Sequence, residues 1–167
     1  LMYDEITASN LVKINLQGEK VEKSEWDINP AGFIIHSAVH SSKDNAHCVM
    51  HTHTNAGMAM AALKKGLINI DFSGSAFHKK VAYHDFEGVT LRKDECRRIA
   101  DDLGDKSVMV LKNHGLLTAG VSVPDAFYAL MRLEKSCQAQ VDAMSTGAEL
   151  HLVPEAVSDH TNGQFKN

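Results

Sequence analysis

Residues 48–53 read CVMHTH, three apolar residues followed by two histidines that lie two positions apart. The consecutive apolar side chains predict a buried strand over residues 46–53. Because side chains on a strand repeat every two residues, His51 and His53 are expected to project from the same face. Two imidazoles held in this way can share one metal ion. The stretch therefore predicts part of a metal site at the end of a buried strand.

A third histidine, His114, lies 61 residues after His53 and also follows an apolar run, in the sequence LKNHG at residues 111–115. Sites in mixed α and β domains are commonly built from side chains beside strand ends. Three imidazoles with an open fourth position are typical of a catalytic zinc centre. We therefore predict a divalent metal on His51, His53 and His114, with Zn²⁺ favoured and Mn²⁺, Fe²⁺, Co²⁺ or Ni²⁺ also compatible. The competing interpretation is that each histidine is a hydrogen-bonded core residue.

The composition is that of one ordinary globular domain. The chain has 167 residues, of which 44% are hydrophobic, enough for a core of its own. A net charge of −4 without a basic cluster argues against nucleic acid as a partner. No apolar run approaches the length of a membrane span. Three cysteines without a C-x-x-C pattern predict reduced thiols in a cytoplasmic protein. Because the chain begins with Leu1 rather than methionine, we expect an N-terminal segment of the natural domain to be missing.

Strand and helix signals alternate along the chain. Asn29 before Pro30 is a typical helix start, and Ser122 begins the longest predicted helix. Asn55 and Thr90 are the expected caps of two further helices. The alternation predicts an α/β or α+β fold in one domain. The expected strands are residues 9–16, 46–53, 67–70, 81–83, 107–111 and 116–118, and the expected helices are residues 30–42, 56–65, 91–103 and 123 to about 144.

Other residues that can move protons lie outside the three-histidine set. His36 and His40 are one helical turn apart, but the helix lacks the glutamate of the H-E-x-x-H zinc motif. We interpret them as polar residues at the edge of an amphipathic helix, with His36 as an acid or base near the metal as the alternative. Tyr83 and Asp85, which flank His84, are further candidates for proton transfer, although such loop residues are often simply solvated. The sequence contains no phosphate-binding glycine motif.

Several segments between Asn29 and about Ala143 together carry a resemblance to a known family. They are NPAGF at residues 29–33 with HSA at 36–38, CVMHTHT at 48–54, VAYHD at 81–85 and LKNHGLL at 111–117. On these segments the chain resembles the class II aldolase/adducin family, and its adducin-like branch in particular. The spacing between His53 and His114 also fits this family.

The resemblance implies a fold and a chemistry. The fold is a three-layer αβα sandwich on a mostly antiparallel sheet, with residues 1–167 forming one domain that lacks its N-terminal segment. Enzymes of the family hold Zn²⁺ or another divalent ion on histidines that match His51, His53 and His114. The ion acts as a Lewis acid that stabilises the enediolate formed when a small hydroxy-carbonyl substrate is cleaved. The resemblance also implies a homotetramer with its active site at a subunit boundary.

Two departures from the aldolase pattern concern the proton-moving half of the site. Sugar-phosphate aldolases carry a general-base glutamate nineteen residues before the first metal histidine, and that position is Gly32 here. The serine pair that grips the substrate phosphate is replaced by Pro30-Ala31. Glu25 lies twenty-six residues before His51, on the wrong side of the helix start, and is no substitute. Because a positioned general base contributes about 10²–10⁴ in rate, ordinary aldolase turnover requires another group.

Three functions therefore stay open. The intact histidine set favours a metal-dependent, aldolase-like lyase that acts on a non-phosphorylated hydroxy-carbonyl or sugar-derived compound. The missing glutamate and serines favour a non-catalytic, adducin-like oligomeric interaction module that retains a metal site. The third function is metal-dependent epimerisation or dehydration on the same scaffold, with Tyr83, His84 or Asp85 moving the protons.

Overall fold

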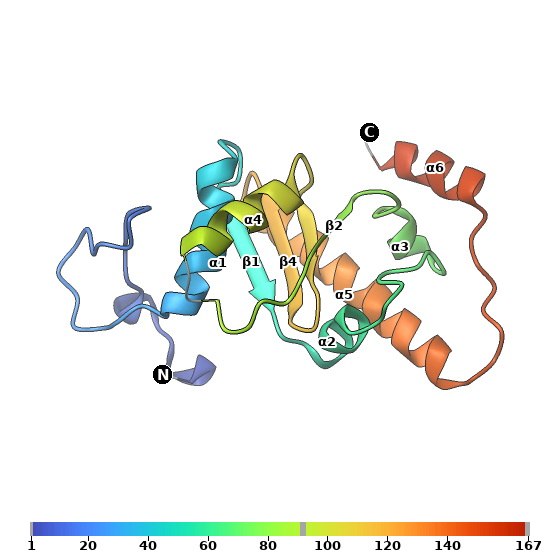
Figure 1. The fold of residues 1–167 in the computed structure, drawn as a ribbon, viewed down its shortest axis with the longest axis horizontal. Helices are drawn as coiled ribbons and strands as arrows, with labels where there is room; N and C mark the ends of the chain where they lie inside the picture. The colour runs from blue at the N-terminus through green and yellow to red at the C-terminus, as the bar shows by residue number, and fades with distance from the viewer. Residues whose placement is uncertain (1, 91–92, 166–167) are drawn as a thin grey trace.

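The computed structural model describes residues 2–90 and 93–165 and centres on a four-stranded sheet (Figure 1). Its strands are β1 (Cys48–Thr52), β2 (Val81–His84), β3 (Val108–Leu111) and β4 (Gly115–Gly120), in the spatial order β1-β4-β3-β2. β4 is antiparallel to both β1 and β3, whereas β2 is parallel to β3. The mostly antiparallel sheet expected from the sequence is confirmed.

Helices cover both faces of this sheet (Figure 1). One buried apolar cluster joins α1 (Pro30–Ser42) and α4 (Lys93–Leu103) to one face of the sheet. A second cluster joins α2 (Asn55–Ala61) and α5 (Val123–Ser145) to the opposite face. The arrangement is an α/β sandwich of three layers, as predicted, because each face of the sheet buries its apolar side chains under its own pair of helices.

Alternation along the strands explains why there are two clusters. On β4, Leu116 packs toward α2 and α5, whereas Leu117 packs toward α1 and α4, and both are fully buried. β3 lies between β4 and β2, and all four of its side chains are buried. A strand covered on both faces needs no polar side, which accounts for the unbroken apolar sequence of β3. Burial of this kind fixes the register of the strands that carry the histidines.

The two helix starts predicted beside prolines are confirmed. The Asn29 side chain accepts hydrogen bonds from two backbone N–H groups in the first turn of α1, which begins at Pro30. Ser122 caps α5 in the same way by accepting from the N–H of Asp125. Each cap satisfies donors that a helix leaves unpaired at its N-terminus.

The strand expected over residues 9–16 is wrong. This segment overlaps a short 3₁₀ helix, Ala8–Asn10, and its only bridge within the described chain joins Ile14 to Lys20. The apolar residues alternate as in a strand, yet Leu11 is 68% exposed. Alternation specifies a strand only where a neighbouring strand and a buried face are available, and this segment has neither.

The strand expected over residues 67–70 is also wrong. The backbone N–H of Leu67 donates to the hydroxyl of Tyr83 at 3.0 Å, and that of Ile68 donates to the side chain of Gln140 at 2.8 Å. Side chains, rather than a neighbouring strand, satisfy these two N–H groups, so the segment can stay irregular although it is apolar.

The helix expected over residues 56–65 is shorter than predicted and has a different cap. Thr54 caps it, not Asn55, and the helix proper ends at Ala61. Turns then lead to Gly66, whose φ of +65° lies in the left-handed region that favours glycine. The cap expected at Thr90 concerns a helix start at residues 91–92, which lie outside the described residues.

Further short elements complete the chain. They are α3 (Phe72–Ser75), α6 (Glu155–Gln164) and the 3₁₀ helix Tyr3–Glu5. α6 returns from the end of α5 to lie beside α3 (Figure 1). In the described part of the chain, no helix combines the length and the apolar character needed to cross a membrane.

Candidate metal centre

The three histidines predicted as ligands lie together at one edge of the sheet. Because β1 and β3 are both antiparallel to β4, their carboxyl ends share this edge. His51 lies within β1, His53 directly follows it, and His114 lies in the turn between β3 and β4. Ring centroids are 4.6 Å apart for His51 and His53, 4.8 Å for His51 and His114, and 4.7 Å for His53 and His114. One nitrogen of each ring lies within 4.8 Å of the others, so the group could hold a metal ion.

A hydrogen bond of His51 leaves its other ring nitrogen available as a ligand. Nδ1 of His51 lies 2.9 Å from the backbone carbonyl oxygen of Leu116. A carbonyl only accepts, so Nδ1 carries the proton and Nε2 keeps its lone pair. Nε2 points at Nε2 of His53, 2.7 Å away. Metal-binding histidines commonly use their second nitrogen in this way to fix the ring, so the donor set fits a divalent transition metal.

The surroundings favour neutral imidazoles at His51 and His114. Burial is the main cause that lowers the pKa of His51 to about 4. The hydrogen bond to the Leu116 carbonyl opposes this effect, and the nearby imidazoles add to it. Burial, followed by the charge of His53, also lowers the pKa of His114. Because a neutral imidazole is the form that binds a metal, His51 and His114 need to lose no proton at pH 7.

The turn between β3 and β4 aims His114 at the other two rings. Asn113 adopts a left-handed backbone with φ of +56°, which asparagine tolerates better than most residues. Its N–H donates to the carbonyl of Ala61 at 3.0 Å. Gly115 then approaches β1 so closely that a Cβ there would lie 2.2 Å from the carbonyl oxygen of Thr52. The residues on both sides of His114 are therefore required by the shape of the turn.

A hydrogen bond between Thr54 and Glu134 ties the cluster to α5. Thr54 directly follows His53, and its hydroxyl donates to Oε2 of Glu134 at 2.5 Å. The same hydroxyl accepts from the N–H of Gly57 at 3.3 Å and so caps α2. Sequence reasoning missed this pair, because its members are 80 positions apart and belong to no motif. Glu134 is a positioning group for the segment that carries His53.

We expect Thr54→Val to weaken metal binding without removing a ligand. Valine loses both hydrogen bonds and leaves Glu134 without its donor, so the segment after His53 is held less firmly. Zn²⁺ affinity is expected to fall about 10-fold, as for other groups that orient metal ligands, and the free energy of unfolding by about 1 kcal/mol. Competition with a chromophoric chelator measures the Zn²⁺ affinity, and urea unfolding measures the free energy of unfolding. Thr146→Val, at an exposed threonine at the end of α5, is the control; equal affinities for the two variants would contradict the role of Thr54.

His36 lies close enough to His51 for its charge to lower the pKa of that residue. Burial, with His40 as the second cause, lowers the pKa of His36 itself, which favours a neutral ring at pH 7. His40 is engaged elsewhere, with Nδ1 2.7 Å from the carbonyl oxygen of Ala46, and it ties the end of α1 to the segment before β1. Gly32, the position that departs from the aldolase pattern, lies one turn before His36 on the same side of α1.

The other residues considered for proton transfer have partners of their own. Tyr83 packs against the cluster under α2 and α5, and its hydroxyl accepts from a backbone N–H. Asp85 pairs with Lys112 at 2.6 Å, and this hydrogen bond lowers the pKa of Asp85. His84 is buried and lies 2.7 Å from Asp102 through Nδ1. The structure brings none of Tyr83, His84 and Asp85 into the group of ligand atoms formed by the three histidines.

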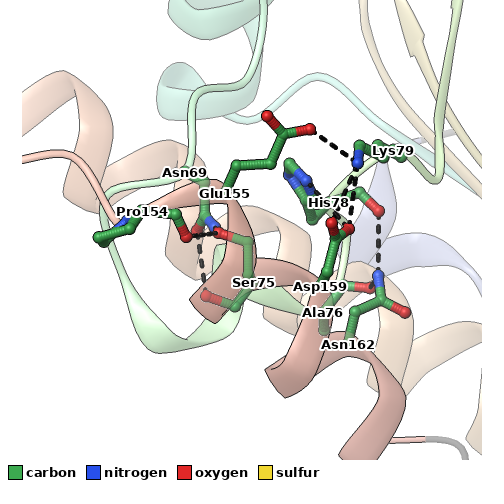
Figure 2. Close-up of polar contacts among 10 residues, drawn as sticks. Asn69, Ser75, Ala76, His78, Lys79, Pro154, Glu155, Asp159 and Asn162 are labelled. Carbon is green, nitrogen blue, oxygen red and sulfur yellow. Dashed lines mark hydrogen bonds and ion pairs between the residues drawn. The ribbon is translucent and has the colours of Figure 1, made fainter.

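A second group with metal-ligand chemistry, His78, Glu155 and Asp159, already has a cation (Figure 2). Nζ of Lys79 lies 2.8 Å from Glu155 and 3.1 Å from Asp159. Nε2 of His78 lies 3.4 Å from Asp159. The ammonium pairs with both carboxylates and joins α6 to the loop after α3, so we assign this group a structural role.

The sequence is similar to proteins of one family along almost its whole length. Residues 1–141 match the family model described as Class II Aldolase and Adducin N-terminal domain. A Caulobacter vibrioides protein provisionally named as a class 2 aldolase is 42% identical over 166 residues, which are 99% of this chain and 65% of the relative. Alpha-adducin of Rattus norvegicus is 42% identical over 157 residues, which are 92% of this chain and 21% of the adducin. The chain thus spans less than two thirds of the length of these relatives.

Solved structures with the same fold include a protein of high sequence similarity. An aldolase II superfamily protein from Pseudomonas syringae is 47% identical with a TM-score of 0.93, over 98% of this chain and 67% of that chain. L-Fuculose 1-phosphate aldolase from Glaciozyma antarctica is 29% identical with a TM-score of 0.82, over 95% of this chain and 61% of the enzyme.

Proposed function

Because the chain belongs to the class II aldolase/adducin family, we propose that it is a metal-dependent lyase that cleaves a small, non-phosphorylated hydroxy-carbonyl compound. The observation that carries this proposal is the convergence of His51, His53 and His114. These residues would hold a divalent ion, with zinc favoured by the three-imidazole set. When bound, the ion would supply Lewis-acid polarisation of the substrate oxygens.

We propose His36 as the residue that moves the proton. Its lowered pKa leaves a neutral ring that can accept a proton at pH 7, and it neighbours His51. A hollow of about 1260 Å³ is lined by His36, Gly32 and residues of the N-terminal segment. At Gly32 a Cβ would meet only Asn29, at 3.8 Å or more, so the chain leaves free space one turn before His36. A substrate placed there would reach His36, which is a neighbour of His51 in the metal centre.

The start of α1 supports a substrate without a phosphate group. Pro30 has no N–H and Ala31 has no hydroxyl, and the N–H of Ala31 is already bound by Asn29 at 3.0 Å. A helix N-terminus binds phosphate through free N–H groups and nearby hydroxyls. Because these donors are absent or engaged, the first turn of α1 has few hydrogen bonds to donate to a phosphate. We therefore propose that the substrate has an uncharged hydroxy-ketone or hydroxy-aldehyde group there.

We expect His36→Asn to lower kcat for cleavage by about 10²-fold or more, the usual contribution of a positioned base. The aldehyde product is measured in a coupled assay on a panel of hydroxy-ketones and sugars, with Zn²⁺, Mn²⁺ or Co²⁺ supplied. Metal content, determined by elemental analysis, should not change, since His36 is not one of the three ligands. His40→Asn is the matched control on the same helix. A wild-type protein that retains its metal and cleaves no member of the panel would refute the lyase.

Two other functions are supported by particular observations. The identity to alpha-adducin and the glycine at position 32 support a non-catalytic, adducin-like interaction module with a retained metal site. Cleavage activity that disappears in His51→Ala would exclude it. Metal-dependent epimerisation or dehydration would use the same histidine set. Analysis of the products for isomerised or dehydrated compounds, in place of two fragments, separates that reaction from cleavage.

We also propose that the protein assembles as a homotetramer with the metal centre near a subunit boundary. Phe86 is 55% exposed although its ring lies 6.3 Å from that of His114, and Val89 is 74% exposed. Exposed apolar side chains beside a polar centre are typical of surfaces that another subunit covers. Sedimentation equilibrium tests the assembly, and a monomeric mass at micromolar concentration would contradict it.

A further inference from the structure

Arg132 is a buried cation without an acidic partner in the described chain. It lies in the middle of α5, is only 7% exposed, and forms no ion pair with residues 2–90 or 93–165. Nη1 donates a long hydrogen bond of 3.4 Å to the hydroxyl of Tyr128, and Nη2 is buried without a hydrogen-bond partner. A guanidinium stays charged, and a buried charge is costly unless it is paired. The fold therefore maintains a buried positive charge with which none of these residues forms an ion pair.

Three aromatic rings lie around this guanidinium, and we call the four residues the arginine cage. Cζ of Arg132 lies 4.0 Å from the ring centroid of Phe165, 5.6 Å from that of Tyr128 and 5.7 Å from that of Phe72. Ring faces attract a cation but accept few of its N–H hydrogen bonds. Phe72 is 71% exposed and Tyr128 is 57% exposed, so the cage is open to solvent on the side of these two rings.

Polar contacts dock α6 against the segment that follows α3 (Figure 2), and this docking holds Phe165 in the cage. Asn162, in the last turn of α6, donates to the carbonyl oxygens of Ala76 at 3.3 Å and His78 at 3.0 Å. Toward the other end of the helix, Lys79 pairs with two acidic residues of α6. Phe165 directly follows α6 and packs on Phe72 with a centroid distance of 5.3 Å. The cage is thus a fixed part of the fold.

Oδ1 of Asp71, an acidic residue near α5, is engaged elsewhere, and its Oδ2 is buried without a hydrogen-bond partner. Its Oδ1 accepts from the N–H of Gly74 at 3.0 Å, which caps α3, and from the hydroxyl of Ser136 at 3.3 Å. Ser136 lies one turn beyond Arg132, whereas long side chains on a helix lean toward its N-terminus. Arg132 accordingly contacts Tyr128, one turn before it, and leaves Asp71 to Ser136.

We propose that the arginine cage binds a small organic anion, namely a carboxylate attached to a flat apolar group. A cavity of about 370 Å³ reaches Arg132 between Tyr128, Gln164 and Phe165, within the roughly 300–1,000 Å³ usual for small-molecule sites. The planar guanidinium matches a carboxylate, which would supply the missing negative charge. The aromatic walls favour an apolar body behind that carboxylate. No cage residue belongs to the histidine cluster, so this site stands apart from the proposed lyase activity.

Calorimetric titration with benzoate tests the site, with benzamide as its neutral counterpart. We expect saturable binding of one benzoate per chain and at least 10-fold weaker binding of benzamide. Arg132→Gln should weaken benzoate binding at least 10-fold, since a charge-assisted contact is lost. Arg132→Lys keeps the charge but not the planar fork, so it should fall between the two. Arg97→Gln, at an 88% exposed arginine on α4, is the matched control and should bind as the wild type does.

Each other outcome overturns the proposal. Equal affinities for benzoate and benzamide would show that the negative charge of the ligand does not contribute to binding. Benzoate binding that survives both Arg132 variants would place the ligand elsewhere, such as at the metal centre. Inorganic phosphate that binds as tightly as benzoate would exclude an organic anion as the preferred ligand. Absence of benzoate binding, together with a lower mass of Arg132→Lys in sedimentation, would assign the cage to a contact between copies of the chain. The lysine variant keeps the test decisive if the glutamine variant fails to fold.

Discussion

Replacement of His51 by alanine is expected to abolish stoichiometric binding of a divalent metal. His51 is the central member of the cluster, since its Nε2 faces Nε2 of His53 at 2.7 Å and its Nδ1 is bound to the Leu116 carbonyl. Alanine removes a ligand and also the hydrogen bond that orients it. Two imidazoles remain, which is one protein ligand fewer than a catalytic zinc site uses. The loss in affinity should therefore exceed the roughly 10–100-fold caused by removal of a group that only orients a ligand.

Elemental analysis of the purified variant and a Co²⁺ titration followed by visible absorption measure this loss. Tetrahedral Co²⁺ would give an intense absorption band in the wild type that His51→Ala should lack. His151→Ala, at an exposed histidine beyond α5, is the control and should keep full metal content. If His51→Ala retains one equivalent of metal, the three histidines are core residues rather than ligands, and the lyase proposal loses its basis.

The elements predicted well from the sequence are those whose signals are local. Asn29 before Pro30 and Ser122 before its helix are capped as expected, because a cap is formed by residues within one turn. β3 was predictable because burial on both faces leaves a direct trace as an apolar run. β1 also follows an apolar run, but it lies at the edge of the sheet, and Val49 is its one buried residue. Residues 9–16 misled because strand formation depends on a neighbour that the local sequence does not describe.

The same distinction applies to the candidate site. The pairing of His51 with His53 follows from the period of a strand, and His114 was added because it also follows an apolar run. The resemblance to a known family then supported the set of three. The structure then brings all three together. Contacts such as that between Thr54 and Glu134 could not be predicted, because they arise where α5 crosses the end of β1 and depend on packing across the whole domain. Arg132 likewise reads as an ordinary helix residue until the fold places aromatic rings around it.

Gly115→Ala is expected to lower the free energy of unfolding by about 3 kcal/mol or more, as expected for severe overpacking of a rigid region. A Cβ at this position would lie 2.2 Å from the carbonyl oxygen of Thr52, and that oxygen belongs to β1 and cannot rotate away. The same Cβ would lie 3.2 Å from Cδ2 of His53 and 3.3 Å from Cε1 of His51. β1 and β4 must separate to admit one methyl group, and the two ligands must move with β1. The variant should therefore lose metal affinity as well as stability.

Urea unfolding of the metal-free and zinc-loaded forms separates these two effects, since zinc stabilises only to the extent that it binds the folded state. Gly163→Ala is the matched control, because its added Cβ meets no atom within 4 Å on the described surface of α6. Alanine within a helix is better than glycine by about 0.5–1 kcal/mol, so this control should be unchanged or slightly more stable. If Gly115→Ala is as stable as Gly163→Ala, and zinc raises its free energy of unfolding as much as that of the wild type, the backbone around the turn can shift to accommodate the methyl group. The glycine after His114 would then serve some purpose other than the close approach of β4 to β1.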